Sequence, residues 1–399
     1  MKKLLIISPY FPYPLDEGGR IRTFNIIKTL STEFDVYLFS FLVEQTSIEK
    51  KELMKYCKDC HTMNIPIHKK DIISKLLRNS KRILLFKNPS SDTFLFKEAK
   101  KGLINYIETN RPDVAIIEHS WLAGYVTLLN ALGVKVILDA HNVESNLWKQ
   151  FYRNSTAVER IPYYFFWKSM SLNEKKFMKH FDLIISTSEL ENEKIKKIAP
   201  QVRNAVIPNG IELDRYVSNE LEEQGSIGFI GLMRYPPNVQ AVMYFVKEIF
   251  PLVKQSIPDV KFYIAGKEPS AEILALSDKK NIFVTGYVSD ALKFISKCSV
   301  IVTPLLQGSG TRTKIIEAMA LKRPVVSTSK GSEGLMVKNG KDIIIEDNPV
   351  DYSNAIISLL KNKNLRKSIG EEAFKTVAAY YSWAAIGDKL ISSVKEAIQ

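Results

Sequence analysis

Apolar and polar residues follow two patterns that alternate along this chain. Short runs of β-branched and other apolar residues are followed by longer segments in which apolar residues recur every three or four positions. The short runs are typical of buried strands and the longer segments of amphipathic helices, so their alternation predicts parallel sheets covered by helices. The strands predicted in the first half are residues 4–8, 35–39, 114–118, 135–139 and 183–186.

The second half repeats this pattern. Its predicted strands are residues 227–230, 261–265, 282–285, 300–303 and 325–327. Between the halves lie a strand end with a turn, Val206-Ile207-Pro208-Asn209-Gly210, and a polar, acidic stretch at 218–224. We therefore expect two domains, 1–208 and 209–382, with a C-terminal helix at about 383–399 packing back on the first. The predicted fold class is α/β, two Rossmann-like doubly wound domains facing across a cleft, with ligands at the carboxyl ends of the strands.

Composition agrees with an ordinary globular protein. The chain has 399 residues, of which 45% are hydrophobic and 25% charged, which suits two domains. The apolar run that follows Lys3 is too short for a signal peptide and reads as a first strand. With only three cysteines, a disulfide framework is not expected, and a reducing cytoplasm is the predicted location.

The segment Cys57-Lys58-Asp59-Cys60-His61 matches a haem-attachment pattern. That chemistry belongs to exported proteins, and one cysteine pair with one histidine does not close a four-ligand zinc site. The simpler interpretation is a cysteine pair at a helix end.

The formal net charge of +13 indicates a negatively charged partner or surface. Nucleotide diphosphates, anionic lipids and nucleic acid all qualify. Nucleic acid has only the net charge in its favour, and the sequence contains no recognisable nucleic-acid-binding module, so we expect no nucleic-acid partner.

Candidate chemistry concentrates in the segment 304–320. A predicted strand runs into a loop that contains Gly308 and Gly310, and the loop opens an apolar-periodic helix. A helix N-terminus attracts phosphate, but Arg312 and Lys314 place cations there, which is unfavourable unless an anion binds between them. Glu317 lies further along the helix, where its carboxylate can accept hydrogen bonds from a ribose. The alternative is an ordinary amphipathic helix with solvated charges.

This segment resembles the donor site of retaining glycosyltransferases of the two-Rossmann (GT-B) type, family four. Matching segments are spread over most of the chain in the same order: Gly18-Gly19, the segment 207–214, Phe229-Ile230-Gly231, the segment 262–266, the segment 284–288, and Glu317-Ala318-Met319-Ala320 leading to Arg323-Pro324. Together they are specific for the superfamily and say little about the substrate.

The resemblance implies roles for individual residues of the second domain. Glu317 would hold the donor ribose, and Arg234 would be a cationic diphosphate residue. The diphosphate and sugar would lie in the loop Gly308, Ser309, Gly310, Thr311, Arg312, Thr313, Lys314, and the base would lie against Gly286, Tyr287 and Val288. The sequence departs from the family twice, with Ser309 in place of a second Glu and Val239 in place of a Lys. Lys314 is a candidate for the missing positive charge.

In the first domain, two histidines follow predicted strands. His119 resembles the family's histidine near the reacting sugar. His141 and Asn142 are weaker acceptor-site candidates, because a strand-end His-Asn is often only a helix-capping turn. Gly18 and Gly19 form a predicted strand-to-helix turn and are donor-site candidates. Arg20 and Arg22 flank that turn and would meet an acidic acceptor or the diphosphate, unless they are solvated surface arginines.

The reaction implied by the resemblance transfers a sugar from a nucleoside diphosphate to an acceptor hydroxyl with retention of anomeric configuration. His119, Arg234, Lys314 and Glu317 would form its catalytic set, in the biosynthesis of cell-envelope polysaccharide, glycolipid or glycoconjugate. No Asp-x-Asp motif occurs, so we expect neither a metal nor another cofactor. A sugar-nucleotide epimerase of the same architecture and a non-catalytic nucleotide-sugar-binding protein remain alternatives.

The stretch 69–87 is both basic and apolar, and the segment 163–167 is a run of aromatic residues. Such a stretch suits contact with the inner face of an anionic membrane, and hence a lipid-linked acceptor. Glycans and peptides are other acceptors that the sequence leaves open. The alternative to membrane contact is a helix packed on the core with a solvated basic face.

Overall fold

The structure is a computed structural model that describes residues 1–399 except 16–17, 43–49, 67–70, 218–219 and 309–311. The chain divides into two compact units. Unit 1 contains Met1–Pro208 and Gly387–Gln399, and unit 2 contains Asn209–Ile386.

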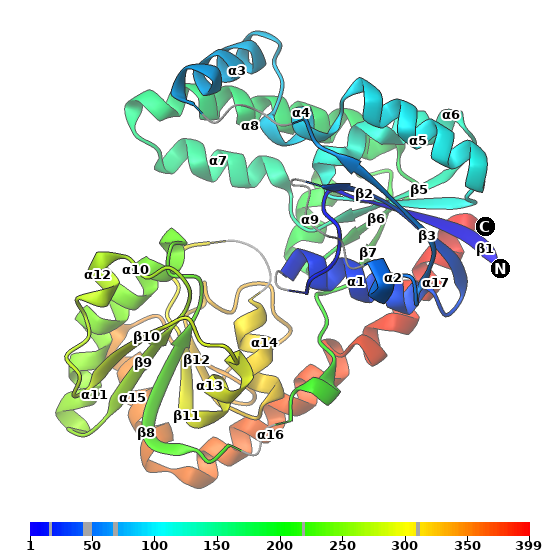
Figure 1. The fold of residues 1–399 in the computed structure, drawn as a ribbon. Coiled ribbons are helices and arrows are strands. Elements are labelled where there is room, and N and C mark those ends of the chain that lie inside the picture. Colours follow the sequence, from blue (N-terminus) through cyan, green and yellow to red (C-terminus); the bar gives the residue numbers. More distant parts are fainter. Residues whose placement is uncertain (16–17, 43–49, 67–70, 218–219, 309–311) are drawn as a thin grey trace. The chain divides into compact units, whose positions relative to one another are not determined.

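Unit 1 is built on a seven-stranded parallel sheet flanked by helices (Figure 1). The strand order is β3-β2-β1-β4-β5-β6-β7. The strands are β1 (Lys2–Ser8), β2 (Phe34–Leu42), β3 (Cys57–Asn64), β4 (Val114–Glu118), β5 (Lys135–Ala140), β6 (Leu183–Ser186) and β7 (Arg203–Val206). The helices are α1 (Gly18–Leu30), α2 (Lys50–Leu53), α3 (Ile72–Leu84), α4 (Pro89–Phe94), α5 (Lys97–Asn110), α6 (Val126–Ala131), α7 (Glu144–Asn154), α8 (Ala157–Phe177) and α9 (Glu189–Ile198).

Unit 2 repeats the architecture with a six-stranded parallel sheet of order β10-β9-β8-β11-β12-β13. Its strands are β8 (Glu223–Ile230), β9 (Lys261–Ala265), β10 (Ile282–Gly286), β11 (Cys298–Thr303), β12 (Val325–Ser327) and β13 (Ile344–Ile345). The helices are α10 (Pro236–Tyr244), α11 (Phe250–Ser256), α12 (Ala271–Leu274), α13 (Ala291–Lys297), α14 (Thr313–Ala320), α15 (Pro349–Lys361) and α16 (Lys363–Tyr380). The last helix, α17 (Trp383–Ile398), begins in unit 2 and ends in unit 1.

Each sheet reverses its strand order at one point, between β1 and β4 in unit 1 and between β8 and β11 in unit 2. In open parallel sheets the connections leave to opposite sides at such a point, so a crevice forms at the carboxyl ends of the two strands. His119 follows β4 directly. Gly231 follows β8, and the segment that leads to Lys314 follows β11. The topology therefore places the principal candidate residues of each unit beside its switch point.

The predicted fold class is confirmed, since both halves are doubly wound parallel sheets. The predicted strands all exist, and the strand end predicted at Val206 is the end of β7. Strands β3 and β13 are additional ones. The interpretation of Cys57 and Cys60 as a helix-end pair is wrong, because both lie buried in strand β3. Only Cys57, Cys60 and Met63 of its eight residues are apolar, so a search for apolar runs did not find this strand.

None of the helices in the described parts of the chain has the length and apolar composition needed to cross a membrane.

Candidate functional site

Lys314 occupies the first turn of α14, directly beyond the carboxyl end of β11. Its ammonium group donates a 2.9 Å hydrogen bond to Asn238 Oδ1 and lies 4.5 Å from the centre of the Phe229 ring. Burial, with a further contribution from the nearby charge of Arg312, lowers the pKa of Lys314 to about 7. A half-buried ammonium with so low a pKa is a cation that an incoming anion would stabilise.

Gly231 makes room for this arrangement at the end of β8. A Cβ atom added there would lie 2.7 Å from Asn238 Nδ2 and 2.8 Å from Lys314 Nζ. Asn238 is itself buried in the first turn of α10, where its Nδ2 donates to the Leu232 carbonyl at 3.0 Å. The glycine therefore lets the lysine and the asparagine meet over the strand end.

Gly266, at the end of β9, is equally constrained. An added Cβ would come within 1.7 Å of the carbonyl oxygen of Gly231, so a side chain there would displace the backbone at the switch point. The family-like segments 229–231 and 262–266 thus pack directly against each other.

Glu317 lies one turn after Lys314 on α14 and is half-buried. Burial raises its pKa to about 7, although Tyr216 and Lys314 act in the opposite direction. The Tyr216 hydroxyl donates to Glu317 Oε1 at 3.5 Å. The helix thus presents a carboxylate and an ammonium at adjacent turns, an arrangement that suits a ligand carrying both hydroxyls and phosphate.

Arg312 is buried at the N-cap position of α14, and its side chain makes no capping hydrogen bond. A Cβ atom added to Gly308 would lie 3.3 Å from Arg312 Nη2, so the glycine lies against the guanidinium. Gly308 has φ +120°, which favours glycine. The other loop candidates, Ser309, Gly310 and Thr311, lie outside the described residues.

The remaining unit 2 candidates lie at neighbouring strand ends. Arg234 is two-thirds exposed, and its Nη1 donates to Glu268 Oε2 at 3.2 Å. Gly286 ends β10 with φ +66°, and its carbonyl accepts from Gly266 N at 2.8 Å. Tyr287 is exposed, with Lys267 Nζ 4.9 Å from its ring centre, and Val288 is half-buried.

In unit 1 the two histidines form one cluster. The rings of His119 and His141 are 4.0 Å apart, and His119 also stacks on Trp121 at 4.2 Å. His119 has φ +64°, a left-handed conformation that is uncommon for a residue with a side chain and is often found at functional sites. Burial, and then repulsion by His119, lowers the pKa of His141 to about 4, so His141 is neutral at physiological pH.

Buried carboxylates lie behind these histidines. Glu144 Oε1 is 3.6 Å from His119 Nδ1. Glu174 accepts hydrogen bonds from Ser120 Oγ at 3.1 Å and Ser145 N at 3.3 Å, and burial raises its pKa to about 7. Burial, with the charge of Asp139, also raises the pKa of Glu118 to about 7.

The expectation that Arg22 meets a ligand or solvent is corrected by the structure. Arg22 is 2% exposed, and it donates to both carboxylate oxygens of Asp139, at 2.9 and 2.6 Å. Its Nη1 also donates to the carbonyls of Ile207 and Pro208 at 3.0 and 3.1 Å. Burial alone would raise the pKa of Asp139, but Arg22 holds it far below its usual range. Arg22 is therefore a structural residue that joins α1, β5 and the end of unit 1.

Among the described residues, Glu118, Asp139 and His141 have ligand atoms within 4.8 Å of one another, the spacing of a metal site. Arg22 occupies both oxygens of Asp139. The buried guanidinium balances the charge of Asp139 and would repel a cation bound beside it.

The remaining unit 1 candidates lie at the start of α1 and just beyond β5. Gly18 and Gly19 are the first two residues of α1 and are exposed, with open space where a Cβ would be. Arg20 and Asn142 are half-buried.

Sequence reasoning missed several residues of the two clusters: Tyr216, Glu144, Glu174 and Glu118. Tyr216 lies 101 positions from Glu317, and Glu174 lies 54 positions from Ser120, so no local pattern marks these contacts.

Comparisons with known proteins show which family this chain resembles. Residues 67–215 match the family model Glycosyltransferase Family 4, and residues 224–362 match Glycosyl transferases group 1. An uncharacterized 44.6 kDa protein in the cps region of Klebsiella pneumoniae is 22% identical, over 99% of each chain. An uncharacterized glycosyltransferase of Methanocaldococcus jannaschii is 24% identical, over 96% of this chain and 94% of the relative. The capsular polysaccharide biosynthesis glycosyltransferase CapM of Staphylococcus aureus is 24% identical, over 46% and 52%.

Solved structures share the fold over nearly the whole chain. Sucrose-phosphate synthase from Thermosynechococcus elongatus superposes with a TM-score of 0.73 at 16% identity, over 99% of both chains. The Anabaena protein HepE, solved in complex with UDP-glucose, has a TM-score of 0.66 at 12% identity, over 98% of this chain and 99% of HepE. With a family 4 match in its first half and a group 1 match in its second, this chain belongs to the glycosyltransferases of the GT-B fold.

Proposed function

We propose that this glycosyltransferase moves a sugar from a nucleoside diphosphate to an acceptor hydroxyl with retention of anomeric configuration, without a metal. The observation that carries the proposal is the pairing of Lys314 and Glu317 on adjacent turns of α14, at the switch point of unit 2. Lys314, with Arg312 beside it, supplies positive charge for a diphosphate. Glu317 supplies a carboxylate acceptor for the ribose hydroxyls. In this proposal unit 2 binds the donor and unit 1 the acceptor.

The cations of unit 2 serve the departure of the diphosphate in this reaction. The bond between the anomeric carbon and the diphosphate oxygen breaks as the acceptor oxygen bonds to the same face of that carbon. The electron pair stays on the diphosphate, and the proton of the acceptor hydroxyl is released. Fixed cations that are already desolvated stabilise the departing charge without reorganisation. We assign this role to Lys314 and Arg312, with Arg234 as a further cation once it leaves Glu268.

The nature of the donor is supported by a neighbour of the same fold, since HepE was solved with UDP-glucose. The name of CapM supports a place in the synthesis of a capsular or other cell-envelope polysaccharide. We therefore propose a UDP or GDP sugar as donor and a glycan, lipid-linked or peptide acceptor, in the cytoplasm.

A panel of nucleotide sugars, assayed for nucleoside-diphosphate release and for sugar isomers, tests the proposal. Release that depends on an acceptor, without isomers, is the expected result. Isomer formation would favour the epimerase alternative. Saturable binding with neither product would make the protein a nucleotide-sugar-binding protein, an alternative that Ser309 and Val239 keep open. Chelation with EDTA is expected to leave the rate unchanged, and a loss of activity restored by Mg²⁺ would contradict metal independence.

A further inference from the structure

Helix α3 turns its apolar residues outward. Ile73, Leu76, Leu77 and Leu84 recur at helical spacing on one face, and their exposed fractions are 71%, 62%, 67% and 84%. A helix packed on its own protein buries that face. The alternative of a core-packed helix with a solvated basic face is therefore wrong.

The other side of α3 holds the helix to unit 1 through polar contacts. Arg82 is buried, and its Nε donates to Asp92 Oδ2 at 3.0 Å. Just beyond the helix, Ser169 Oγ on α8 donates to the Phe86 carbonyl at 2.7 Å. Anchoring by the polar side fixes the apolar face toward solvent.

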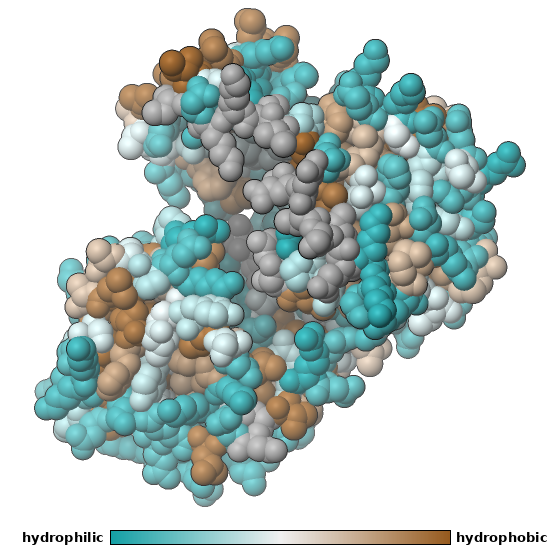
Figure 2. Space-filling model, viewed as in Figure 1, coloured by the Kyte–Doolittle hydropathy of each residue, from teal (hydrophilic) through white to brown (hydrophobic). Residues whose placement is uncertain are grey.

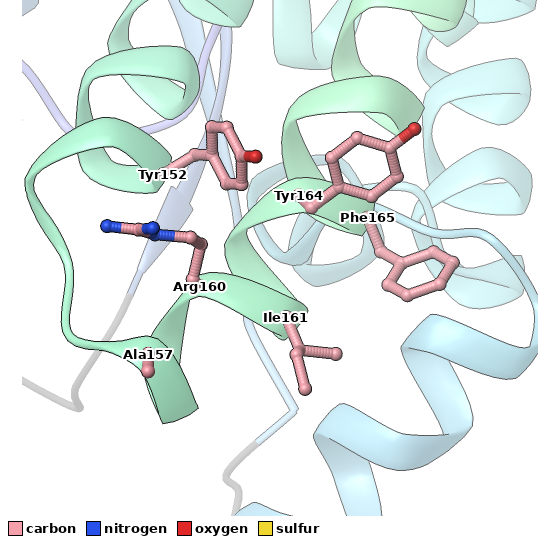
Figure 3. Close-up of a pocket in the computed structure, with 6 residues that line it drawn as sticks. All are labelled: Tyr152, Ala157, Arg160, Ile161, Tyr164 and Phe165. Atoms are coloured by element: carbon pink, nitrogen blue, oxygen red, sulfur yellow. The ribbon is translucent and has the colours of Figure 1, made fainter.

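A second apolar feature adjoins α3. Tyr152 on α7 and five residues of α8 line a pocket of about 320 Å³, shown in Figure 3; the α8 residues are Ala157, Arg160, Ile161, Tyr164 and Phe165. Phe165 of this pocket meets the ring of Phe86 edge to face, with centroids 6.4 Å apart. Pocket and helix are thus neighbours, and Figure 2 shows hydrophobic residues gathered over α3.

Basic residues predominate around this surface, and two of them, Arg82 and Lys87, pair with Asp92. The segment from Ile72 to Lys87 contains no acidic residue and five basic ones: Lys75, Arg78, Lys81, Arg82 and Lys87. Arg160 adds an exposed guanidinium at the pocket. An apolar stripe beside flexible lysines is the composition of a helix that lies in the interface of an anionic bilayer, with aliphatic groups among the acyl chains and ammonium groups at the phosphates.

We propose that α3, together with the pocket between α7 and α8, docks this enzyme on an anionic lipid bilayer. Ile73, Leu76, Leu77 and Leu84 enter the acyl region. Lys75 and Lys81 bind headgroup phosphates, while the pocket takes an acyl chain whose phosphate meets Arg160. The inference does not rest on the proposed transfer reaction, because docking requires neither donor nor acceptor.

Flotation of the full-length protein with vesicles tests the proposal. We expect binding to phosphatidylcholine vesicles that contain about 30% phosphatidylglycerol, and little binding to pure phosphatidylcholine. The triple variant Ile73→Ser, Leu76→Ser, Leu77→Ser should bind at least about ten-fold more weakly. The double variant Lys75→Gln, Lys81→Gln should lose about five-fold per lysine on anionic vesicles and nothing on neutral ones.

The matched control removes three exposed apolar side chains from unit 2: Leu221→Ser, Leu274→Ser and Val350→Ser. This control should bind vesicles as the parent protein does. Circular dichroism and the affinity for UDP-glucose should be the same in all variants, so a failure of docking is distinguishable from a failure of the proposed function. Absence of binding by the parent protein, or equal binding by the α3 variants, would overturn the proposal. So would a dimer that the α3 substitutions dissociate, since the apolar face would then belong to a second copy.

Discussion

The ammonium group of Lys314 lies 2.9 Å from the side-chain oxygen of Asn238. The contact joins the first turn of α14 to the first turn of α10 across the end of β8, where Gly231 leaves space for it. The bond positions a desolvated cation at the place where a phosphate would bind in a doubly wound sheet.

Substitution of Lys314 should weaken donor binding in a pH-dependent way. The folded-state pKa of Lys314 is about 7, against its ordinary value of 10.5, so the free enzyme loses this charge as pH rises through 7. A bound diphosphate restores the charge, and UDP-glucose binding near pH 8 should therefore take up a proton. Calorimetry in buffers of different ionisation enthalpy measures that uptake. The Lys314→Gln variant has no ammonium group at this position, so we expect it to lose this proton uptake. Its affinity for UDP-glucose should be lower by about 10- to 100-fold.

Lys361→Gln on the exposed part of α15 is the matched control. It should leave the proton uptake and the affinity for UDP-glucose unchanged. Equal proton uptake by the parent protein and Lys314→Gln would show that Lys314 does not meet the diphosphate.

Replacement of Glu317 should remove the proposed ribose contact. We expect Glu317→Ala to weaken UDP-glucose binding by about 10- to 100-fold while the circular dichroism spectrum stays the same, because hydrogen bonds to a charged acceptor are worth about 1.5–3 kcal/mol. Glu371→Ala, on the exposed surface of α16, serves as the control in the same titration. Unchanged affinity in Glu317→Ala would count against the assignment of this carboxylate.

His119 should affect turnover more than donor binding. We expect His119→Ala to lower kcat by about 100-fold or more, with donor affinity within about three-fold of the parent, since the proposed role is at the reacting sugar. Steady-state kinetics with a competent acceptor, combined with calorimetry, separates the two effects. His180→Ala removes an exposed histidine of the same unit and should be silent. A loss confined to donor affinity would assign His119 to binding instead.

Arg22 should matter for stability. Arg22→Met leaves the Asp139 carboxylate buried without its arginine, which typically costs about 3–5 kcal/mol. Urea unfolding monitored by fluorescence measures the change. Adding Asp139→Asn removes the buried charge and should recover a large part of the loss. The surface pair of Lys135 and Asp182 provides the comparison, since Lys135→Met should cost no more than about 1 kcal/mol. An Arg22→Met protein as stable as the parent would show that the pair carries no net stabilisation.

The sequence by itself determined most strands of the two sheets and marked the candidate donor segment. The runs 114–117 and 300–302 are apolar on both faces, which is typical of a buried strand in a parallel sheet, so consecutive residues were enough to predict them. The same holds for the segment from Gly308 to Glu317, where glycines and misplaced cations at a helix start are visible in consecutive residues. The mixed polar strand β3 lacked such a pattern and was missed.

Only the tertiary structure decided which of these residues meet. Arg22 looked like a surface residue beside Gly18 and Gly19, because its partner Asp139 lies 117 positions away. The contact of Lys314 with Asn238 depends on two helices brought together by neighbouring strands. Helical periodicity shows that α3 has an apolar and a polar face, but the same periodicity fits either orientation. Its polar anchors to Asp92 and α8 turn the apolar face outward, because contacts between distant residues, and not local propensity, set the orientation of a helix on its domain.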